Sequence, residues 1–161
     1  MKVVSNSSPL IALAKINKLH ILKDMFDEIF IPKSVWIEVV EKGRGKYGSE
    51  EVKNAKWIKV IDVKDRLSVE ILNKEIEIGE AEAIVLAKEL KADFLILDEK
   101  IPRIIAKSLG INVVGTLALL FIAKKKGIID EDLDDLIKEL RIKGVYFSDK
   151  IIEELKKIHK I

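Results

Sequence analysis

The sequence predicts an α/β fold in which a short parallel sheet lies between layers of helices. Short β-branched runs alternate with longer segments whose apolar residues recur at the 3.6-residue period of a helix. Residues 94–97 are apolar throughout, as in strands that are buried on both faces. Strands separated by helices join through right-handed crossovers into a parallel sheet, and 161 residues suffice for one domain with its own core.

In the first third of the chain we expect strands at 3–4 and 29–31, the second ended by Pro32. Ser8 is expected to cap a helix at 10–18, with Pro9 at its first position. Further helices are expected at 20–26 and 35–42, although the β-branched content of the latter also fits a strand. Glycines make 43–49 a loop.

The rest of the chain repeats this alternation. Strands are expected at 57–63, 94–97 and 112–114. Helices are expected at 65–74, 80–90, 102–109, 117–126, 131–140 and 149–160. No stretch resembles an interdomain linker, so the sequence predicts a single domain over 1–161. The C-terminal helix, at about 148–160, should pack on this domain or on a partner.

Composition limits the chemistry of any site. The chain has no Cys and only two His, which excludes a thiol nucleophile, a Cys-based metal site and a His-rich metal site. The 29 Lys and Arg nearly balance the 27 Asp and Glu, which argues against a polycationic nucleic-acid tail. Catalysis would therefore depend on carboxylates, hydroxyls and lysines.

Composition also carries expectations about the protein's surroundings. No apolar run approaches the roughly 20 residues that cross a bilayer, and the first residues make a poor signal peptide. We therefore expect a cytoplasmic protein without a membrane partner. Abundant Lys and Glu, with no Gln, are typical of proteins from hyperthermophiles.

Several polar residues follow predicted strands, where open parallel sheets bind ligands. Asp98, with Glu99 beside it, directly follows the strand at 94–97 and is the strongest candidate, although it could instead pair with Arg103. Ser8 and Thr116 also follow strands, and for both the simplest interpretation is a helix N-cap.

Three further acids lie in predicted helices. Glu38 is surrounded by apolar residues and either pairs with Lys42 on the surface or lies at the edge of the core. Glu80 and Glu82 are about 200° apart around their helix, so only one of them should face a site. Acids from separate segments, without His or Cys, suit Mg²⁺ or Mn²⁺, which activate water and neutralise charge on a phosphodiester.

Four segments, in order and over nearly the whole chain, resemble a PIN domain, specifically the prokaryotic DUF3368-type proteins related to VapC toxins. They are VVSNSSPLIALAKI, IPKSVWIEVV, GEAEAIVLAKEL and FLILDEKIPRIIAKSLGINVVGTLALLFIAKKKGII. The resemblance implies a three-layer αβα sandwich with a short parallel sheet of four to five strands. It also implies an endoribonuclease dependent on Mg²⁺ or Mn²⁺, cleaving single-stranded or structured RNA. The toxin of a toxin–antitoxin pair, a homodimer and a small antitoxin partner are further implications.

Carried over to this sequence, the resemblance implies catalytic acids at Glu38, Glu80 and Asp98, which would also bind the metal. The lower-ranked metal ligands are Asn6, Glu82 as an alternative to Glu80, and Glu99. The family's usual Asp after the first strand is Asn6 here, and an amide lacks the negative charge that favours a cation. The alternative is therefore a catalytically weakened PIN module that acts in RNA or protein binding.

RNA binding would need positive charge near the acids. The loop after Glu38 is the candidate for substrate contact, because Tyr47 could stack on a base among neighbouring cations. A flexible solvated turn is the competing interpretation of the same loop. The cations near it are Lys33, Lys42, Arg44 and Lys46. The assigned substrate-binding residues are Ser7, Ser8, Arg44, Lys46 and Thr116.

Overall fold

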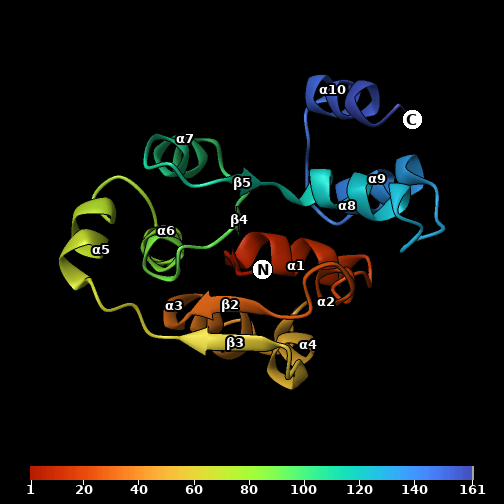
Figure 1. Cartoon of the computed structure of the whole chain (residues 1–161). Helices are drawn as coiled ribbons and strands as arrows, with labels where there is room; N and C mark the ends of the chain where they lie inside the picture. Colours follow the sequence, from red (N-terminus) through yellow and green to blue (C-terminus); the bar gives the residue numbers. More distant parts are fainter. Residues whose placement is uncertain (161) are drawn as a thin grey trace.

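The structure, a computed structural model, describes residues 1–160 and contains a five-stranded sheet in which every paired strand is parallel to its neighbour. The strand order is β3-β2-β1-β4-β5 (Figure 1). The predicted α/β fold, with a parallel sheet between helices, is confirmed. The strands are β1 (Val3–Ser5), β2 (Ile29–Pro32), β3 (Ile58–Ile61), β4 (Phe94–Ile96) and β5 (Val113–Val114).

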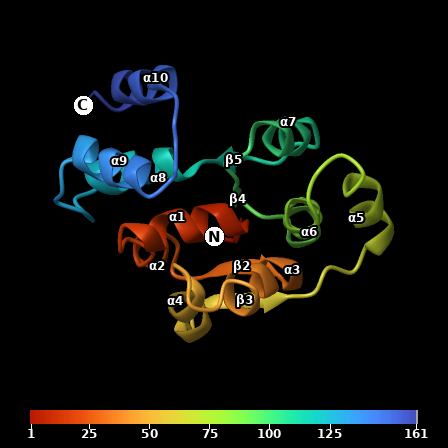
Figure 2. The ribbon, with the colours of Figure 1, turned by 180° about the vertical axis from the view of Figure 1, so that it is seen from behind.

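Helices cover both faces of this sheet. Figures 1 and 2 show α5, α6 and α7 on one side and α1, α2, α8 and α9 on the other. The helices in the first half of the chain are α1 (Ser7–Lys15), α2 (Ile21–Phe26), α3 (Lys33–Trp36), the π-helix η1 (Ile37–Glu41), α4 (Ser49–Asn54) and α5 (Arg66–Leu72). Those in the second half are α6 (Ile78–Leu90), α7 (Lys100–Ser108), α8 (Thr116–Lys125), α9 (Leu133–Ile142) and α10 (Asp149–His159).

Strand alternation divides the apolar core into two layers. Val3 and Ile96 belong to the layer that includes residues of α1 and α8, whereas Val4 and Leu95 belong to the layer that includes residues of α6. Successive side chains of a strand point to opposite faces, so a strand buried on both faces must be apolar at nearly every position. This requirement explains the continuous apolar run at 94–97.

The topology determines where a site can form. From central β1 the chain builds β2 and β3 on one side, then crosses back to add β4 and β5 on the other. The carboxyl ends of β1 and β4 therefore flank the point at which the strand order reverses, where open α/β sheets form a crevice. Ser5 pairs with Ile96 at these ends, and the Asn6 N–H donates to the Ile96 carbonyl at 3.1 Å.

Several helix starts differ from the prediction. Helix α1 begins at Ser7 with Asn6 as its N-cap residue, so the prediction that Ser8 caps it is wrong. Helix α7 begins at Lys100, two residues before the expected start. Helix α9 begins at Leu133 because the Asp132 carboxylate accepts hydrogen bonds from the Asp134 and Asp135 N–H groups. The N-cap residues of α1 and α7, Asn6 and Glu99, make no such side-chain bond.

The helix expected at 35–42 is present and ends in the π-helix η1. The Lys42 N–H donates to the Ile37 carbonyl at 2.8 Å, which is the five-residue spacing of a π-helix. A Cβ atom on Gly43 would lie 2.4 Å from the Val39 carbonyl oxygen, so this wide turn can close only at a glycine. The π-turn carries Glu38.

The C-terminal helix α10 packs on α8. Ile152 is buried in this contact, and the rings of Phe121 and His159 lie 5.7 Å apart. Ile151 and Ile158 stay exposed on α10. Across residues 1–160, no helix has the length and apolar character to cross a membrane.

Candidate metal centre and adjoining clefts

Asn6 and Glu38 share a small space in front of Gly79. A Cβ atom on Gly79 would lie 3.5 Å from both Asn6 Oδ1 and Glu38 Oε2, so the missing side chain leaves that space open. Asn6 is buried, and within residues 1–160 its Oδ1 atom has no hydrogen-bond partner. A buried acceptor without a donor is costly, and a bound cation would satisfy it.

Glu80 lies in the first turn of α6, next to Gly79. The Glu77 N–H donates to the Glu80 carboxylate at 3.1 Å, and this bond orients the side chain. Burial raises the pKa of Glu80, the bond from Glu77 lowers it, and the charges of Glu77, Glu99 and Glu38 raise it again, with a net increase. Glu80 is therefore a buried acid among other acids, a position that a cation would stabilise.

Asp98 is held by the start of α8. The Thr116 N–H donates to Asp98 Oδ1 at 2.8 Å, and the Thr116 hydroxyl donates to Asp98 Oδ2 at 2.6 Å. Burial raises the pKa of Asp98 and outweighs the two bonds from Thr116 and the charge of Arg103, which lower it. The prediction that Thr116 caps α8 is wrong, because Thr116 is its first residue and Asp98 accepts the N–H instead.

Arg103 contributes charge near Asp98 without a direct ion pair in the described residues. Its Nη1 donates to the Leu97 carbonyl at 2.7 Å. A Cβ atom on Gly115 would lie 3.1 Å from Asp98 Oδ1 and 3.2 Å from Arg103 Nη1. Glycine at this position therefore leaves room for the carboxylate and the guanidinium to face the same space.

Glu82 points to a different part of the molecule from Glu80. It accepts hydrogen bonds from the Ser34 N–H at 3.0 Å and from Arg66 Nη1 at 2.7 Å. Burial raises the pKa of Glu82, but the bonds from Ser34 and Arg66 together outweigh burial and leave the pKa below its ordinary value. Glu82 thus joins α6 to α3 and α5, and its oxygens are occupied.

The acids are neighbours without forming a closed cage. Across residues 1–160, no three Asp, Glu or His side chains lie close enough together to hold a metal ion. The donors still suit a hard cation: oxygen atoms only, one of them buried without a partner, around a space that a Cβ atom would fill. The predicted ligand set of Asn6, Glu38, Glu80 and Asp98 therefore stays a prediction that the chemistry of these residues fits.

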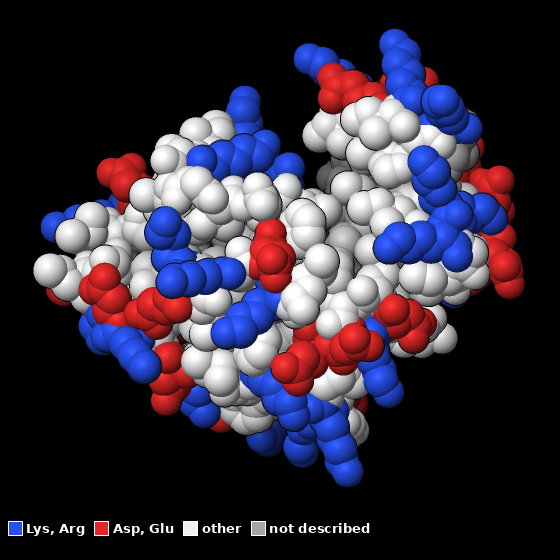
Figure 3. All heavy atoms as spheres, viewed as in Figure 1, with Lys and Arg blue, Asp and Glu red and all other residues white. Residues whose placement is uncertain are grey.

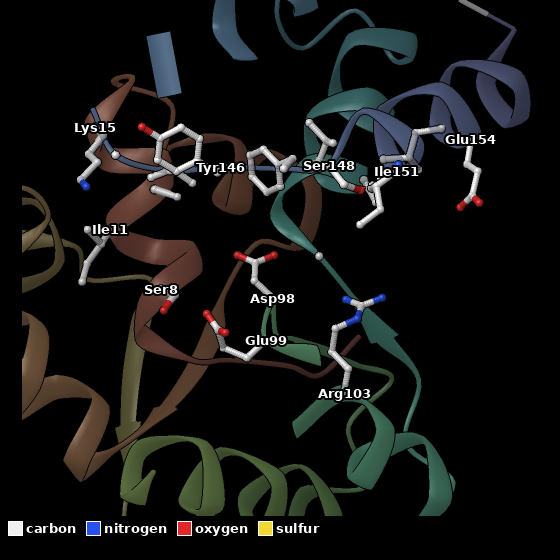
Figure 4. A pocket seen from close by; sticks show the side chains of 18 of the residues that line it. Ser8, Ile11, Lys15, Asp98, Glu99, Arg103, Tyr146, Ser148, Ile151 and Glu154 are labelled. Carbon is white, nitrogen blue, oxygen red and sulfur yellow. Dashed lines mark hydrogen bonds between the residues drawn. The ribbon is translucent and has the colours of Figure 1, made fainter. Parts of the chain in front are cut away.

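A cleft of about 640 Å³ opens beside Asp98 and Glu99, and we call it the Asp98 cleft. The surface is hollowed between the part that carries α7 and the part that carries α10 (Figure 3). In Figure 4, Ser8, Asp98 and Glu99 lie on one side of this cleft and Tyr146, Ser148 and Ile151 on the other. The wall opposite the acids therefore comes from α10 and the segment before it.

A second cleft of about 870 Å³ has Glu38 in its lining, and we call it the Tyr47 cleft. Its lining includes Lys42, Lys46 and Tyr47 from the loop after η1, together with Lys143 from the end of α9. Ile11 and Lys15 of α1 line both clefts, so the two adjoin. Asp98 and Glu99 thus line one cleft, and Glu38 lines the other.

The residues predicted to contact substrate are divided by the structure. Ser8 lines the Asp98 cleft and Lys46 the Tyr47 cleft, whereas Arg44 is exposed and lines neither. Ser7 and Thr116 are buried. Lys33, expected near the loop, instead lies over the Trp36 ring at 4.8 Å from its centroid.

Sequence reasoning missed Lys15 and Lys143 as lining residues. They are 128 residues apart and meet because the ends of α1 and α9 meet. In the sequence, each is simply a cation near the end of a helix, where the helix dipole alone explains it. No local pattern in the sequence pairs them.

Comparison with protein families gives one result for the whole chain: the PIN domain family DUF3368 matches residues 2–160. No curated protein matches. PIN domains are typically metal-dependent nucleases and generally bind divalent metals. The oxygen donors of Asn6, after β1, and of Asp98, after β4, agree with that chemistry. The chain is a PIN domain of the DUF3368 family.

Proposed function

We propose that this protein is a metal-dependent endoribonuclease. The observation that carries the proposal is that Asn6 Oδ1 and Glu38 Oε2 both border the space that a Cβ atom on Gly79 would fill. The charge of Glu38 acts on Glu80, so Glu80 is near this space, and Asn6 follows β1 at the reversal of strand order, where open α/β sheets bind ligands. Oxygen donors of this kind suit Mg²⁺ or Mn²⁺.

In this proposal Asn6, Glu38 and Glu80 hold the cation, with Asp98 and Glu99 nearby. A bound Mg²⁺ or Mn²⁺ would supply positive charge that acidifies water and neutralises charge on a phosphodiester. This role needs no His or Cys, which agrees with the composition of the chain.

The chain's own residues contribute orientation. The bond from Glu77 orients Glu80, and the two bonds from Thr116 orient Asp98, so neither carboxylate has to be ordered when substrate binds. A bound cation would lower the pKa of Glu80 again, so Glu80 acts in this proposal as a metal ligand rather than as a proton acceptor.

Two observations favour a second candidate function, a catalytically weakened PIN module that binds RNA or a protein. Position 6 carries a neutral amide, and the described acids do not converge as a group of three. A site with one charge fewer binds a divalent cation less tightly. This candidate shares the fold and the clefts and differs only in whether cleavage follows binding.

The finer assignments rest on the resemblance to VapC toxins alone. They are cleavage of single-stranded RNA, a toxin held inactive by a small antitoxin, and a homodimer. Each assignment names a molecule that the protein would bind: RNA, an antitoxin or a second copy of the chain. The oxygen donors of Asn6, Glu38 and Glu80 are compatible with all three.

The test is cleavage of a 5′-labelled single-stranded RNA by purified protein with Mn²⁺, Mg²⁺ or EDTA. Glu38→Gln is the test variant, and Glu41→Gln, three residues on in the same π-helix, is its matched control. We expect cleavage only with metal, a loss of about 100-fold or more in Glu38→Gln, and wild-type rates in Glu41→Gln. Cleavage in EDTA, or cleavage that survives Glu38→Gln, would contradict the nuclease proposal. Binding without cleavage would favour the second candidate.

A further inference from the structure

The Tyr47 cleft combines positive charge with one half-exposed aromatic ring. Four lysines line it, and its acidic residues are Glu38 and Glu51. Glu51 is already used, because its carboxylate accepts the Gly48 N–H at 2.9 Å. The Tyr47 side chain is 49% exposed. The four lysines are Lys15, Lys42, Lys46 and Lys143.

The Tyr47 ring is held in place by residues from the far end of the sequence. Lys143 Nζ lies 5.3 Å from the ring centroid, a cation–π distance. The same ammonium donates to the Lys15 carbonyl at 2.6 Å and to Glu139 Oε2 at 2.8 Å. In return, Lys15 Nζ donates to the Lys143 carbonyl at 2.9 Å.

This pair of reciprocal bonds fixes the ends of α1 and α9 against each other beneath the loop. Two like charges are placed together there because each lies at the negative end of a helix dipole. The Tyr47 ring and the ammonium groups of Lys15 and Lys143 are thus ordered before any ligand binds, so binding would not have to order them.

We propose that the Tyr47 cleft binds one unpaired nucleotide of an RNA strand, with the base stacked on Tyr47 and the flanking phosphates at Lys42 and Lys46. The proposal rests on the proposed function in taking RNA as the substrate. A base offers a flat face to the ring, and its phosphates match the lysines, which is the combination that single-stranded nucleic-acid sites use. An acidic peptide would use the lysines but not the ring. Glu38 lines the same cleft, so a strand bound in it would lie beside one of the candidate acids.

The test is the affinity for a fluorescein-labelled single-stranded RNA of about 12 nucleotides, measured by anisotropy in EDTA so that cleavage plays no part. We expect Tyr47→Ala to raise the Kd at least about fivefold and Tyr47→Phe to keep it within about twofold. Leu67, an exposed apolar residue of α5 that lines neither cleft, serves as the control, and Leu67→Ala should stay within about twofold of wild type. With the same RNA annealed to its complement, Tyr47→Ala should not change the Kd, because paired bases offer no free face.

The lysines are tested separately through salt dependence. Each phosphate contact with a single strand adds about 0.7 to the slope of log K against log salt. The double variant Lys42→Gln/Lys46→Gln should therefore lower the slope by about 1.4. Lys53→Gln/Lys56→Gln, which lies outside the lining of the cleft, should leave the slope unchanged.

An unchanged Kd for Tyr47→Ala, with an unchanged Tm, would overturn the proposal. So would poly-L-glutamate that displaces RNA equally well from wild type and Tyr47→Ala, which would indicate an acidic protein partner. The two proposals fail separately. RNA binding that depends on Tyr47 in a protein that never cleaves would refute only the nuclease. Metal-dependent cleavage with Tyr47-independent binding would refute only this subsite.

Discussion

Glu80 and Glu82 lie on two sides of helix α6, and their carboxylates are almost equally buried but have different partners. Glu80 is 7% exposed and Glu82 is 5% exposed. Glu82 accepts bonds from Ser34 and Arg66, and its pKa is lowered in spite of burial. Glu80 accepts one bond, lies near other carboxylates, and has a raised pKa.

The difference shows that burial alone does not identify a functional acid. Glu82 has the partners that a buried charge needs, so its role is to hold α6 against α3 and α5. Glu80 is kept among like charges at a cost in stability, and such a cost is common where an acid serves binding or catalysis. Single substitutions should separate the two roles, and the effects we expect decrease from Glu80→Gln to Arg66→Ala.

The largest effect is expected for Glu80→Gln. We expect RNA cleavage to fall about 100-fold or more, because the variant loses a charged metal donor. The metal-free protein should have an unchanged or higher Tm, since the amide still accepts the Glu77 bond and removes repulsion from Glu38 and Glu99. Cleavage assays with Mn²⁺ and thermal melts in EDTA give the two values.

Calorimetric titration with Mn²⁺ extends this test beyond activity. Binding should be lost in Glu80→Gln and kept in Glu82→Gln. A variant of Glu80 that binds Mn²⁺ as wild type does, or that melts several degrees lower, would place Glu80 among the structural carboxylates.

Much of the fold could be predicted from the sequence because its signals are local. Periodicity and β-branched runs located all five strands and the main helices, because an element buried on one or two faces needs apolar residues at regular positions in the sequence. Helix starts were less accurate, because α1 and α7 begin after residues that make no side-chain cap bond, Asn6 and Glu99. Asp98 shows the limit: it binds Thr116, which lies 18 residues along the chain, and no local signal indicates that bond.

The site was harder to predict for the same reason. The spacing of Glu80 and Glu82 shows that only one should face a site, but the choice depends on Ser34, 48 residues away, and on Arg66. The Tyr47 cleft likewise depends on the contact between α1 and α9, which brings Lys15 and Lys143 together. Tertiary partners, rather than local pattern, decide these roles.

The second largest effect is expected for Glu82→Ala, and it is on stability. The Ser34 N–H would lose its acceptor and Arg66 its partner, at a cost of about 2–3 kcal/mol. Urea unfolding in EDTA measures this loss. Cleavage per folded molecule should stay within about threefold of wild type. A large loss of cleavage in a protein that is still folded would mean that Glu82 belongs to the site.

Asn6→Asp tests the space in front of Gly79, on the side of α6 that carries Glu80. The new carboxylate should tighten Mn²⁺ binding about tenfold, since it adds a charged oxygen beside Glu38. The metal-free protein should become less stable for the same reason. Calorimetry and melts with and without Mn²⁺ separate the two effects. Equal Mn²⁺ affinity in both proteins would show that Asn6 Oδ1 does not face the cation.

The smallest effect is expected for Arg66→Ala, and its size follows from exposure. The Arg66 side chain is 57% exposed, so water can replace the guanidinium, whereas Glu82 keeps its bond from the Ser34 backbone. A partly exposed ion pair of this kind contributes about 0.5–1 kcal/mol. In a double-mutant cycle with Glu82→Ala, measured by urea unfolding, the coupling energy should therefore stay below the cost of Glu82→Ala alone. A coupling energy as large as that cost would mean that Arg66, rather than the Ser34 N–H, provides most of the stabilisation of Glu82. The difference between Glu82 and Glu80 would then come from the guanidinium alone, because each carboxylate also accepts one backbone N–H bond.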